Sequence, residues 1–147
     1  MRIFTSMGTR STIAVQHATG RISMIRCQWD GYPHHVGLYL YKYYPSLAIV
    51  EELISYGNLI SIDTRIHPYS KKHTYNDPEP GVCIYFARDS GREDSQVCID
   101  EYADMAEYEN AIQTMPNKPQ YQYLFHNERW YLNGEWLKSA IKRSQSN

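Results

Sequence analysis

The alternation of apolar and polar side chains predicts two strands near the start of the chain. Residues 11–17 alternate, with Ile13 and Val15 on one side, which is typical of a strand. Residues 21–29 form a second apolar stretch after a short glycine-containing turn, so the two segments predict a β-hairpin. The turn-forming segment 30–33 (DGYP) ends this hairpin.

Helical spacing follows the hairpin. Residues 36–44 place apolar side chains on one face, and this predicted helix ends at Pro45, because proline disfavours helical geometry in the residue before it. Ser46 is a suitable N-cap for a second predicted helix over residues 47–56. Gly57 suits the left-handed position at the C-terminus of that helix.

The middle of the chain has less regular patterning. Residues 63–81 contain several prolines and no period, which predicts a long irregular loop. Residues 82–88 predict a buried strand, and residues 89–94 a charged turn. An acidic helix is expected over residues 99–114, stopped by the proline-containing segment 116–119.

A second hairpin and a short helix complete the pattern. Residues 121–125 and 129–132 predict the hairpin, and residues 136–143 a basic helix. This order predicts a single α+β domain over residues 1–147, with a mainly antiparallel sheet of two hairpins plus a central strand, packed with three to four helices. Residues 1–7 are interpreted as a flexible N-terminal extension.

Composition favours an ordinary soluble domain. The 147 residues are 42% hydrophobic and 21% charged, as in globular proteins of one domain. No apolar run approaches the ~18 residues of a membrane span, and no signal peptide is visible, so a cytoplasmic location is expected. The three cysteines have no CxxC spacing and are expected to be reduced thiols. The 14 tyrosines suit either half-buried core positions or a recognition surface.

Charge cancels overall but is unevenly placed. The net charge of −1 excludes a generally basic nucleic-acid-coating protein, and only the cluster of Lys138, Lys142 and Arg143 favours direct nucleic-acid binding. Residues 76–109 hold ten acidic and two basic side chains. Such a segment is typical of a solvated helix face or of a surface that binds a basic partner. The predicted partner-binding residues on the acidic helix are Tyr102, Asp104, Glu107, Tyr108 and Glu109.

A second candidate surface lies where the second strand leads into the first helix. Its acid, imidazole and aromatic groups would meet a cation from the strand 82–88 if the fold brings them together. Arginines there would hold a phosphate while an aromatic ring stacks on a base, although the DGYP segment equally suits a purely structural turn. The predicted ligand rim consists of Arg10, Trp29, Asp30, Tyr32, His34, Arg88 and Asp89.

No motif predicts catalysis or a metal. Adjacent histidines such as His34 and His35 point in opposite directions in an extended segment, and no HxH or HExxH spacing occurs. No P-loop or GxSxG elbow is present either. We therefore assign no catalytic residue, no metal ligand and no cofactor from the sequence, and the pattern leans towards a protein that is not an enzyme.

Several short segments resemble a group of small uncharacterised proteins encoded by bacteriophages and prophages. The group shares an MGTRS-type start and a W/F-D-G-Y-P segment, which correspond to residues 7–13 and 28–33. Residues 51–57, 85–93 and 121–131 fit the same pattern. The chain departs from it in having the pair His34-His35 and in Ser90, which interrupts what resembles an R-D-R-G-E turn. No agreed activity belongs to the group, so the resemblance implies a viral or mobile-element origin.

The sequence thus leads to two functional hypotheses. The first is a phage accessory protein that binds a host protein or protein complex and inhibits a host defence system by steric occlusion, as an anti-CRISPR protein does. The alternative is a nucleotide-binding protein that sequesters or hydrolyses a small nucleotide. A homodimer is left open in both cases.

Overall fold

The computed structural model describes residues 9–145, so the predicted extension over residues 1–7 lies outside the described residues. Within them the elements follow one another in this order: β1 (Ser11–Gln16), β2 (Ile22–Cys27), a π-helical turn η1 (Pro33–Gly37), α1 (Leu38–Tyr43), α2 (Leu47–Ser55), β3 (Leu59–Ser61), β4 (Ile84–Tyr85), α3 (Phe86–Asp89), β5 (Asp100–Tyr102), α4 (Met105–Thr114), β6 (Tyr121–His126), β7 (Arg129–Leu132), β8 (Glu135–Trp136) and α5 (Leu137–Gln145).

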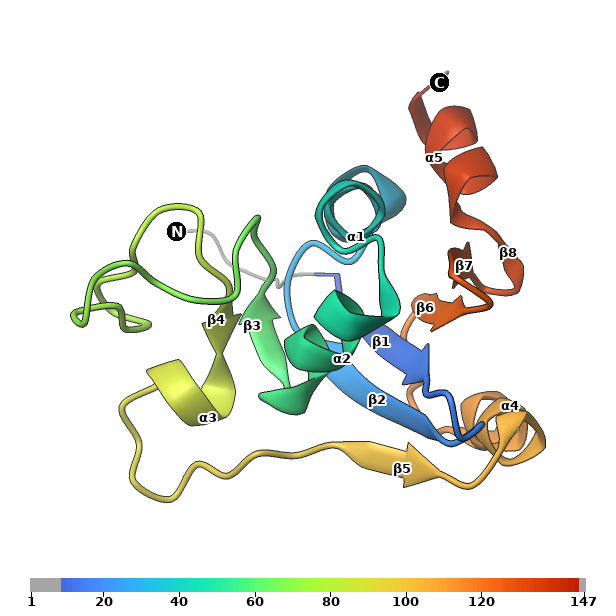
Figure 1. Ribbon diagram of the computed structural model, residues 1–147, viewed down its shortest axis with the longest axis horizontal. Coiled ribbons are helices and arrows are strands. Elements are labelled where there is room, and N and C mark those ends of the chain that lie inside the picture. Colours follow the sequence, from blue (N-terminus) through green and yellow to red (C-terminus); the bar gives the residue numbers. More distant parts are fainter. Residues whose placement is uncertain (1–8, 146–147) are drawn as a thin grey trace.

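The strands form one mixed, eight-stranded sheet in the order β4-β3-β2-β1-β6-β7-β8, with β5 paired to the other end of β2 (Figure 1). The predicted α+β class and both predicted hairpins are confirmed, and most pairs are antiparallel. The prediction missed β3, β5 and β8 and two parallel pairs, β1 with β6 and β2 with β3. It also expected three to four helices, whereas the described residues form five α-helices, because the single turn α3 was not predicted. The missed strands β3, β5 and β8 have two or three residues each, too few to show an alternating pattern.

Both faces of the central strands are covered. Ile13 and Val15 point into the larger core, which side chains of α1, α2 and α5 complete. Ala14 and Met24 point to the opposite face and pack with Tyr108 of α4. All of β1 except its last residue is therefore buried, whereas its pattern suggested polar neighbours between the core positions.

Two predicted elements have different bounds in the structure. The strand expected over residues 82–88 is limited to β4, and its second half is the single-turn helix α3. This strand was predicted to be central, but β4 lies at the edge of the sheet. The acidic helix begins at Met105, because Asp104 caps it and residues 100–102 form β5 instead. The expected irregular loop 63–81 is confirmed, and only one isolated bridge, from Arg65 to Val82, interrupts it.

Tyrosine is used here as a core residue with a polar tip. Tyr44, Tyr85 and Tyr123 are fully buried, and each hydroxyl donates to a backbone carbonyl. The acceptors are Asp63, Leu53 and Gly31, at 2.6, 2.6 and 2.7 Å. Burial raises the pKa of all three phenols. These three tyrosines therefore stabilise the fold, since each ring fills the core while its hydroxyl donates to a carbonyl in an irregular segment (Asp63, Gly31) or in the last turn of α2 (Leu53).

None of the helices over residues 9–145 has the length and apolar character that crossing a membrane requires.

Candidate functional site

The DGYP segment joins β2 to η1 in a tightly packed turn. Asp30 has a left-handed backbone with φ of 58°. Gly31 donates its N–H to the Thr9 carbonyl at 2.8 Å, and a Cβ atom there would lie 2.9 Å from both the Thr9 oxygen and the Ser11 Cβ atom. Only glycine leaves room for this approach, because real Cβ contacts are not that short. The glycine of the motif thus has a structural role.

Part of the predicted ligand rim gathers around this turn. The Tyr32 hydroxyl donates to the Asp30 carboxylate at 3.0 Å, and the Tyr32 ring stacks on His34 with 4.7 Å between ring centroids. The hydrogen bond to Asp30 raises the pKa of Tyr32. Arg10 is exposed, and Trp29 turns to the long loop, where its ring lies 6.3 Å from that of Tyr75.

Arg88 and Asp89 have a different role from the one predicted. The Arg88 guanidinium donates to the Asp89 carboxylate at 2.9 Å and to the Ile66 and Cys83 carbonyls at 2.8 and 3.0 Å. Asp89 is only 4% exposed and accepts the Tyr85 N–H at 2.8 Å. Each of the three guanidinium nitrogens donates to a group inside the protein, so Arg88 is committed to the fold, and Asp89 does not belong to a surface rim.

His73 completes this cluster, and it belongs to no motif that could have identified it from the sequence. Its side chain is buried on the long loop, where its Nδ1 atom accepts the Glu79 N–H at 2.9 Å. Its Nε2 atom lies 3.2 Å from the Cys83 carbonyl oxygen and 3.4 Å from the Asp89 carboxylate. Because Nδ1 accepts, Nε2 carries the proton and donates. His73, Arg88 and Asp89 together fasten the long loop to β4.

The predicted partner-binding residues divide into three groups. Tyr108 is 5% exposed and packs in the smaller core with the half-buried Tyr102, so its side chain does not meet a partner. Asp104 accepts the Glu107 N–H at 2.9 Å, and Glu107 accepts the Ala103 N–H at 2.9 Å. Asp104 is therefore the N-cap of α4, and Glu107 reaches back to the residue before it, so both acids stabilise the start of the helix. Glu109 is exposed and has no such role.

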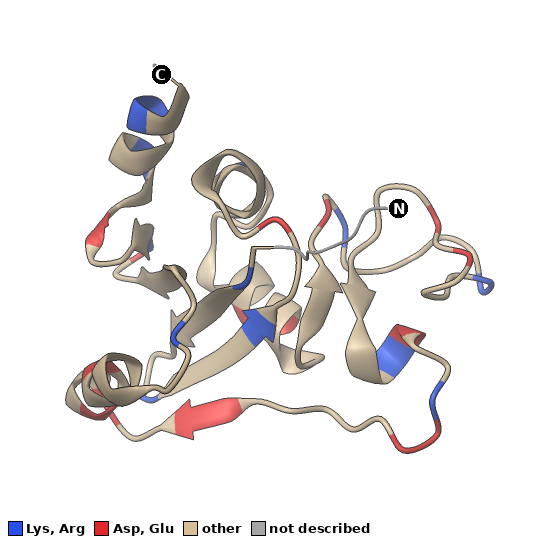
Figure 2. Ribbon diagram, turned by 180° about the vertical axis from the view of Figure 1, so that it is seen from behind, with Lys and Arg blue, Asp and Glu red and all other residues tan. Residues whose placement is uncertain are grey.

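Acidic residues are concentrated in one part of the fold. In Figure 2 the ribbon is red at acidic positions of β5, of α4 and of the segment between α3 and β5. We call the carboxylates of β5 and α4 the acidic face. It consists of Asp100, Glu101, Asp104, Glu107 and Glu109. All are exposed, and within residues 9–145 none forms an ion pair with a lysine, arginine or histidine.

A hydrogen-bonded chain at the other end of the first hairpin was also missed. His17 Nδ1 lies 2.5 Å from the Glu51 carboxylate and Nε2 lies 2.7 Å from Ser23 Oγ, the spacing of a nucleophilic triad. Ser23 Oγ, however, donates to Glu101 at 2.9 Å. A hydroxyl has one proton, so Ser23 can only accept from His17 in this arrangement.

Ser23 is 6% exposed and does not line the cavity that His17 reaches. The chain Glu51–His17–Ser23–Glu101 therefore acts as a brace between the hairpin, α2 and β5. Its members are dispersed along the sequence, so no local motif could have shown it.

Comparisons with known proteins add no family. No protein-family model, curated protein or solved structure matches this chain. Among residues 9–145, no three His, Cys, Asp or Glu side chains are grouped so that they could hold a metal ion.

Proposed function

We propose that the protein is a phage-encoded binding protein that inhibits a host defence system in the host cytoplasm, as anti-CRISPR proteins do. It acts by steric occlusion: the acidic face covers a basic functional surface of a host protein. The observation that carries this proposal is the set of exposed carboxylates on β5 and α4 without a basic partner in the described chain.

Charge supports this choice of surface. Acidic groups that are not neutralised within the protein raise the rate of encounter with a basic partner and favour one orientation of docking. The alternative, nucleotide binding at the Asp30 and Arg88 rim, is less well supported. Arg88 was expected to hold the phosphate there, but its guanidinium donates to groups inside the protein.

The carboxylates are not equivalent, and the structure shows which of them can be changed safely. Asp104 and Glu107 cap α4, and Glu101 accepts from Ser23, so reversing their charge would disturb the fold. Asp100 and Glu109 are exposed, and no hydrogen bond or ion pair to their carboxylates occurs among the described residues. These two acids are the ones through which the proposal is best tested.

The test measures plaque formation by a targeted phage on bacteria that carry a CRISPR system and express this protein. The wild-type protein is expected to restore plaques. The double variant Asp100→Lys/Glu109→Lys is expected to give at least tenfold fewer plaques than the wild type. The control Asp77→Lys/Glu128→Lys makes the same charge change at exposed positions away from β5 and α4 and should behave as wild type.

Two results would overturn the proposal. Absence of restored plaques with the wild-type protein across a panel of CRISPR types would contradict the inhibitory function. Equal activity of the double variant and the control would contradict the role of the acidic face. Circular dichroism and thermal unfolding of both variants establish that they remain folded.

A further inference from the structure

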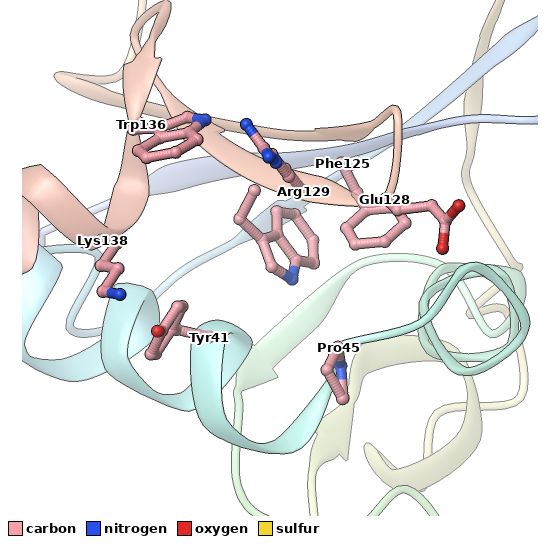
Figure 3. A pocket seen from close by; sticks show the side chains of 8 residues that line it. Tyr41, Pro45, Phe125, Glu128, Arg129, Trp136 and Lys138 are labelled. Atoms are coloured by element: carbon pink, nitrogen blue, oxygen red, sulfur yellow. The ribbon is translucent and has the colours of Figure 1, made fainter.

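A pocket of about 230 Å³ opens between α1, β7 and the β8–α5 segment. Figure 3 shows Tyr41 and Lys138 close together on one side of it, Trp136 and Arg129 above, and Phe125 and Glu128 on the other side. None of these residues belongs to the acidic face or to the predicted ligand rim. The pocket is therefore a separate feature of the surface.

The floor of the pocket is rigid and apolar. Phe125 and Trp130 are 1% and 5% exposed, and their rings meet edge to face with 5.2 Å between centroids. The Trp130 indole N–H donates to the Tyr44 carbonyl at 2.8 Å. Because this hydrogen bond and the core packing fix Trp130, the pocket is already formed before any ligand arrives.

The rim presents aromatic surface to solvent. Tyr41 and Trp136 are 42% and 43% exposed, which is high for such large apolar rings. The Arg129 guanidinium carbon lies 4.4 Å from the centre of the Trp136 ring, so a cation–π contact holds this ring from one side. Exposed rings beside a preformed apolar floor favour a flat ligand that stacks.

The charges of the pocket favour an anion. Arg129 and Lys138 are exposed, and neither forms an ion pair with a residue of the described chain. Glu128 is the acidic residue of the lining, so the two cations outnumber it. An arginine and a lysine at the edge of an aromatic pocket are suited to a phosphate group.

We propose that this pocket binds a nucleotide, with the base against the aromatic rings of Trp136 and Tyr41 and the phosphate at Arg129 and Lys138. Stacking on aromatic side chains favours every base, because each base presents a π-face. The volume of about 230 Å³ is below that of common ligand pockets, and it suits a single ring system rather than a dinucleotide. The nucleotide is either free or the end of a single strand. This inference does not depend on the acidic face.

The test titrates the full chain with the four common nucleoside monophosphates by calorimetry and by tryptophan fluorescence. At least one of them is expected to bind with a submillimolar Kd. The matching nucleoside, which lacks the phosphate, should bind at least tenfold more weakly, and inorganic phosphate alone should not quench Trp136. A short oligonucleotide that binds more tightly than the monophosphate identifies a strand end as the ligand, and equal or weaker binding identifies the free nucleotide.

Matched variants locate the site. Arg129→Gln and Lys138→Gln should each weaken binding at least tenfold, and Trp136→Phe should weaken it by a smaller factor. Lys72→Gln, which changes an exposed lysine on the long loop, should not. The inference is overturned by the absence of binding at millimolar concentrations, or by binding that Arg129→Gln and Lys138→Gln leave unchanged. The variant Asp100→Lys/Glu109→Lys should keep nucleotide binding, so the two proposals fail separately.

Discussion

The Tyr123 hydroxyl donates a 2.7 Å hydrogen bond to the Gly31 carbonyl oxygen, across 92 positions of the chain. Tyr123 lies on β6, the parallel neighbour of β1, and Gly31 lies in the turn that leads from β2 to η1. Both residues are buried. This one contact therefore joins the second hairpin to the DGYP turn and fixes where the first helical segment begins.

Replacing Tyr123 by phenylalanine tests that connection. Tyr123→Phe keeps the ring in the core but leaves the buried Gly31 carbonyl without this donor, which typically costs about 1–3 kcal/mol. We expect the free energy of unfolding in urea to fall by that amount. The control Tyr131→Phe removes a hydroxyl from a half-buried ring without a hydroxyl hydrogen bond in the described chain, and should be close to neutral. Equal stability of both variants would contradict the importance of the contact.

Gly31→Ala tests the space around the same turn. The new Cβ atom would lie 2.9 Å from the Thr9 carbonyl oxygen, a backbone atom that cannot rotate away. Overpacking of this kind costs roughly 1–3 kcal/mol, so thermal unfolding should occur at a lower temperature. Gly91→Asn is the control, because nothing lies within 4 Å of the added atom and asparagine tolerates the φ of +78° there. A Gly31→Ala protein as stable as this control would show that the turn can relax.

Glu79 gives the long loop a pH-dependent connection. Its carboxylate accepts hydrogen bonds from Arg65 and from the Tyr69 and Ser70 N–H groups, the last two at 2.9 and 2.7 Å. The hydrogen bond from Arg65, then that from Tyr69, lowers the pKa of Glu79 to about 2. The unfolded pKa of a glutamate is about 4.3. Since the folded pKa is the lower one, Glu79 stabilises the loop above about pH 4.3, and this contribution is lost as the pH falls towards about 2.

Hydrogen exchange of residues 63–81 measures the effect. After correction for intrinsic exchange rates, protection in the wild-type loop should decrease between about pH 5 and about pH 3. Glu79→Gln should show reduced protection at both values and lose the difference between them. Asp77→Asn, which alters an exposed carboxylate of the same loop, should keep the wild-type profile. A pH response that survives in Glu79→Gln would place its origin elsewhere.

The parts of the fold that the sequence predicted depend on local patterns. Both hairpins, α2 and α5 follow from apolar spacing and turn residues between them, and Gly57 adopts the left-handed conformation expected of it. Ser46 occupies the expected N-cap position, yet its side chain does not cap the helix. The parallel pairing of β1 with β6 was not predictable in this way. Most of the chain lies between these two strands, and no local sequence pattern indicates which distant strands pair.

The candidate sites were less predictable because they depend on the path of the backbone. The acidic helix begins at Met105 and not near residue 99, as the pattern suggested. As a result, Tyr108 packs against the sheet, and Asp104 and Glu107 accept hydrogen bonds at the start of the helix. Arg88 and Asp89 meet His73 only through the course of the long loop. A cluster whose members come from a loop without periodicity gives no pattern by which it could be recognised.

Replacing His17 by alanine distinguishes a structural role of the Glu51–His17–Ser23–Glu101 brace from a catalytic one. His17→Ala removes contacts to Glu51 and Ser23 that join the hairpin to α2, so we expect the free energy of unfolding to fall by roughly 1–2 kcal/mol. His67→Ala is the control, since His67 is exposed and its side chain forms one hydrogen bond in the described chain, to Glu52, and exposed pairs contribute less. A fluorophosphonate probe should leave the mass of the wild-type protein unchanged. Labelling of Ser23 that His17→Ala abolishes would instead identify a nucleophile.

The reactivity of the cysteines tests the packing of the core without a binding partner. All three are free, but only Cys98 is exposed. Burial raises the pKa of Cys27 to about 12 and also raises that of Cys83, so neither forms the reactive thiolate near neutral pH. Cys83 Sγ additionally lies 3.3 Å from the Tyr44 hydroxyl and from the Asp63 N–H inside the core.

A thiol-specific disulfide reagent should therefore modify one cysteine rapidly in the native protein and all three in denaturant. Cys98→Ser should abolish the rapid phase without changing stability, because its side chain is exposed. The slow phases of Cys27 and Cys83 then report opening of the core, and Tyr123→Phe should accelerate them by the same factor by which it raises the unfolded population. Rapid modification of a second native thiol would contradict the packing of β2 or of the segment before β4.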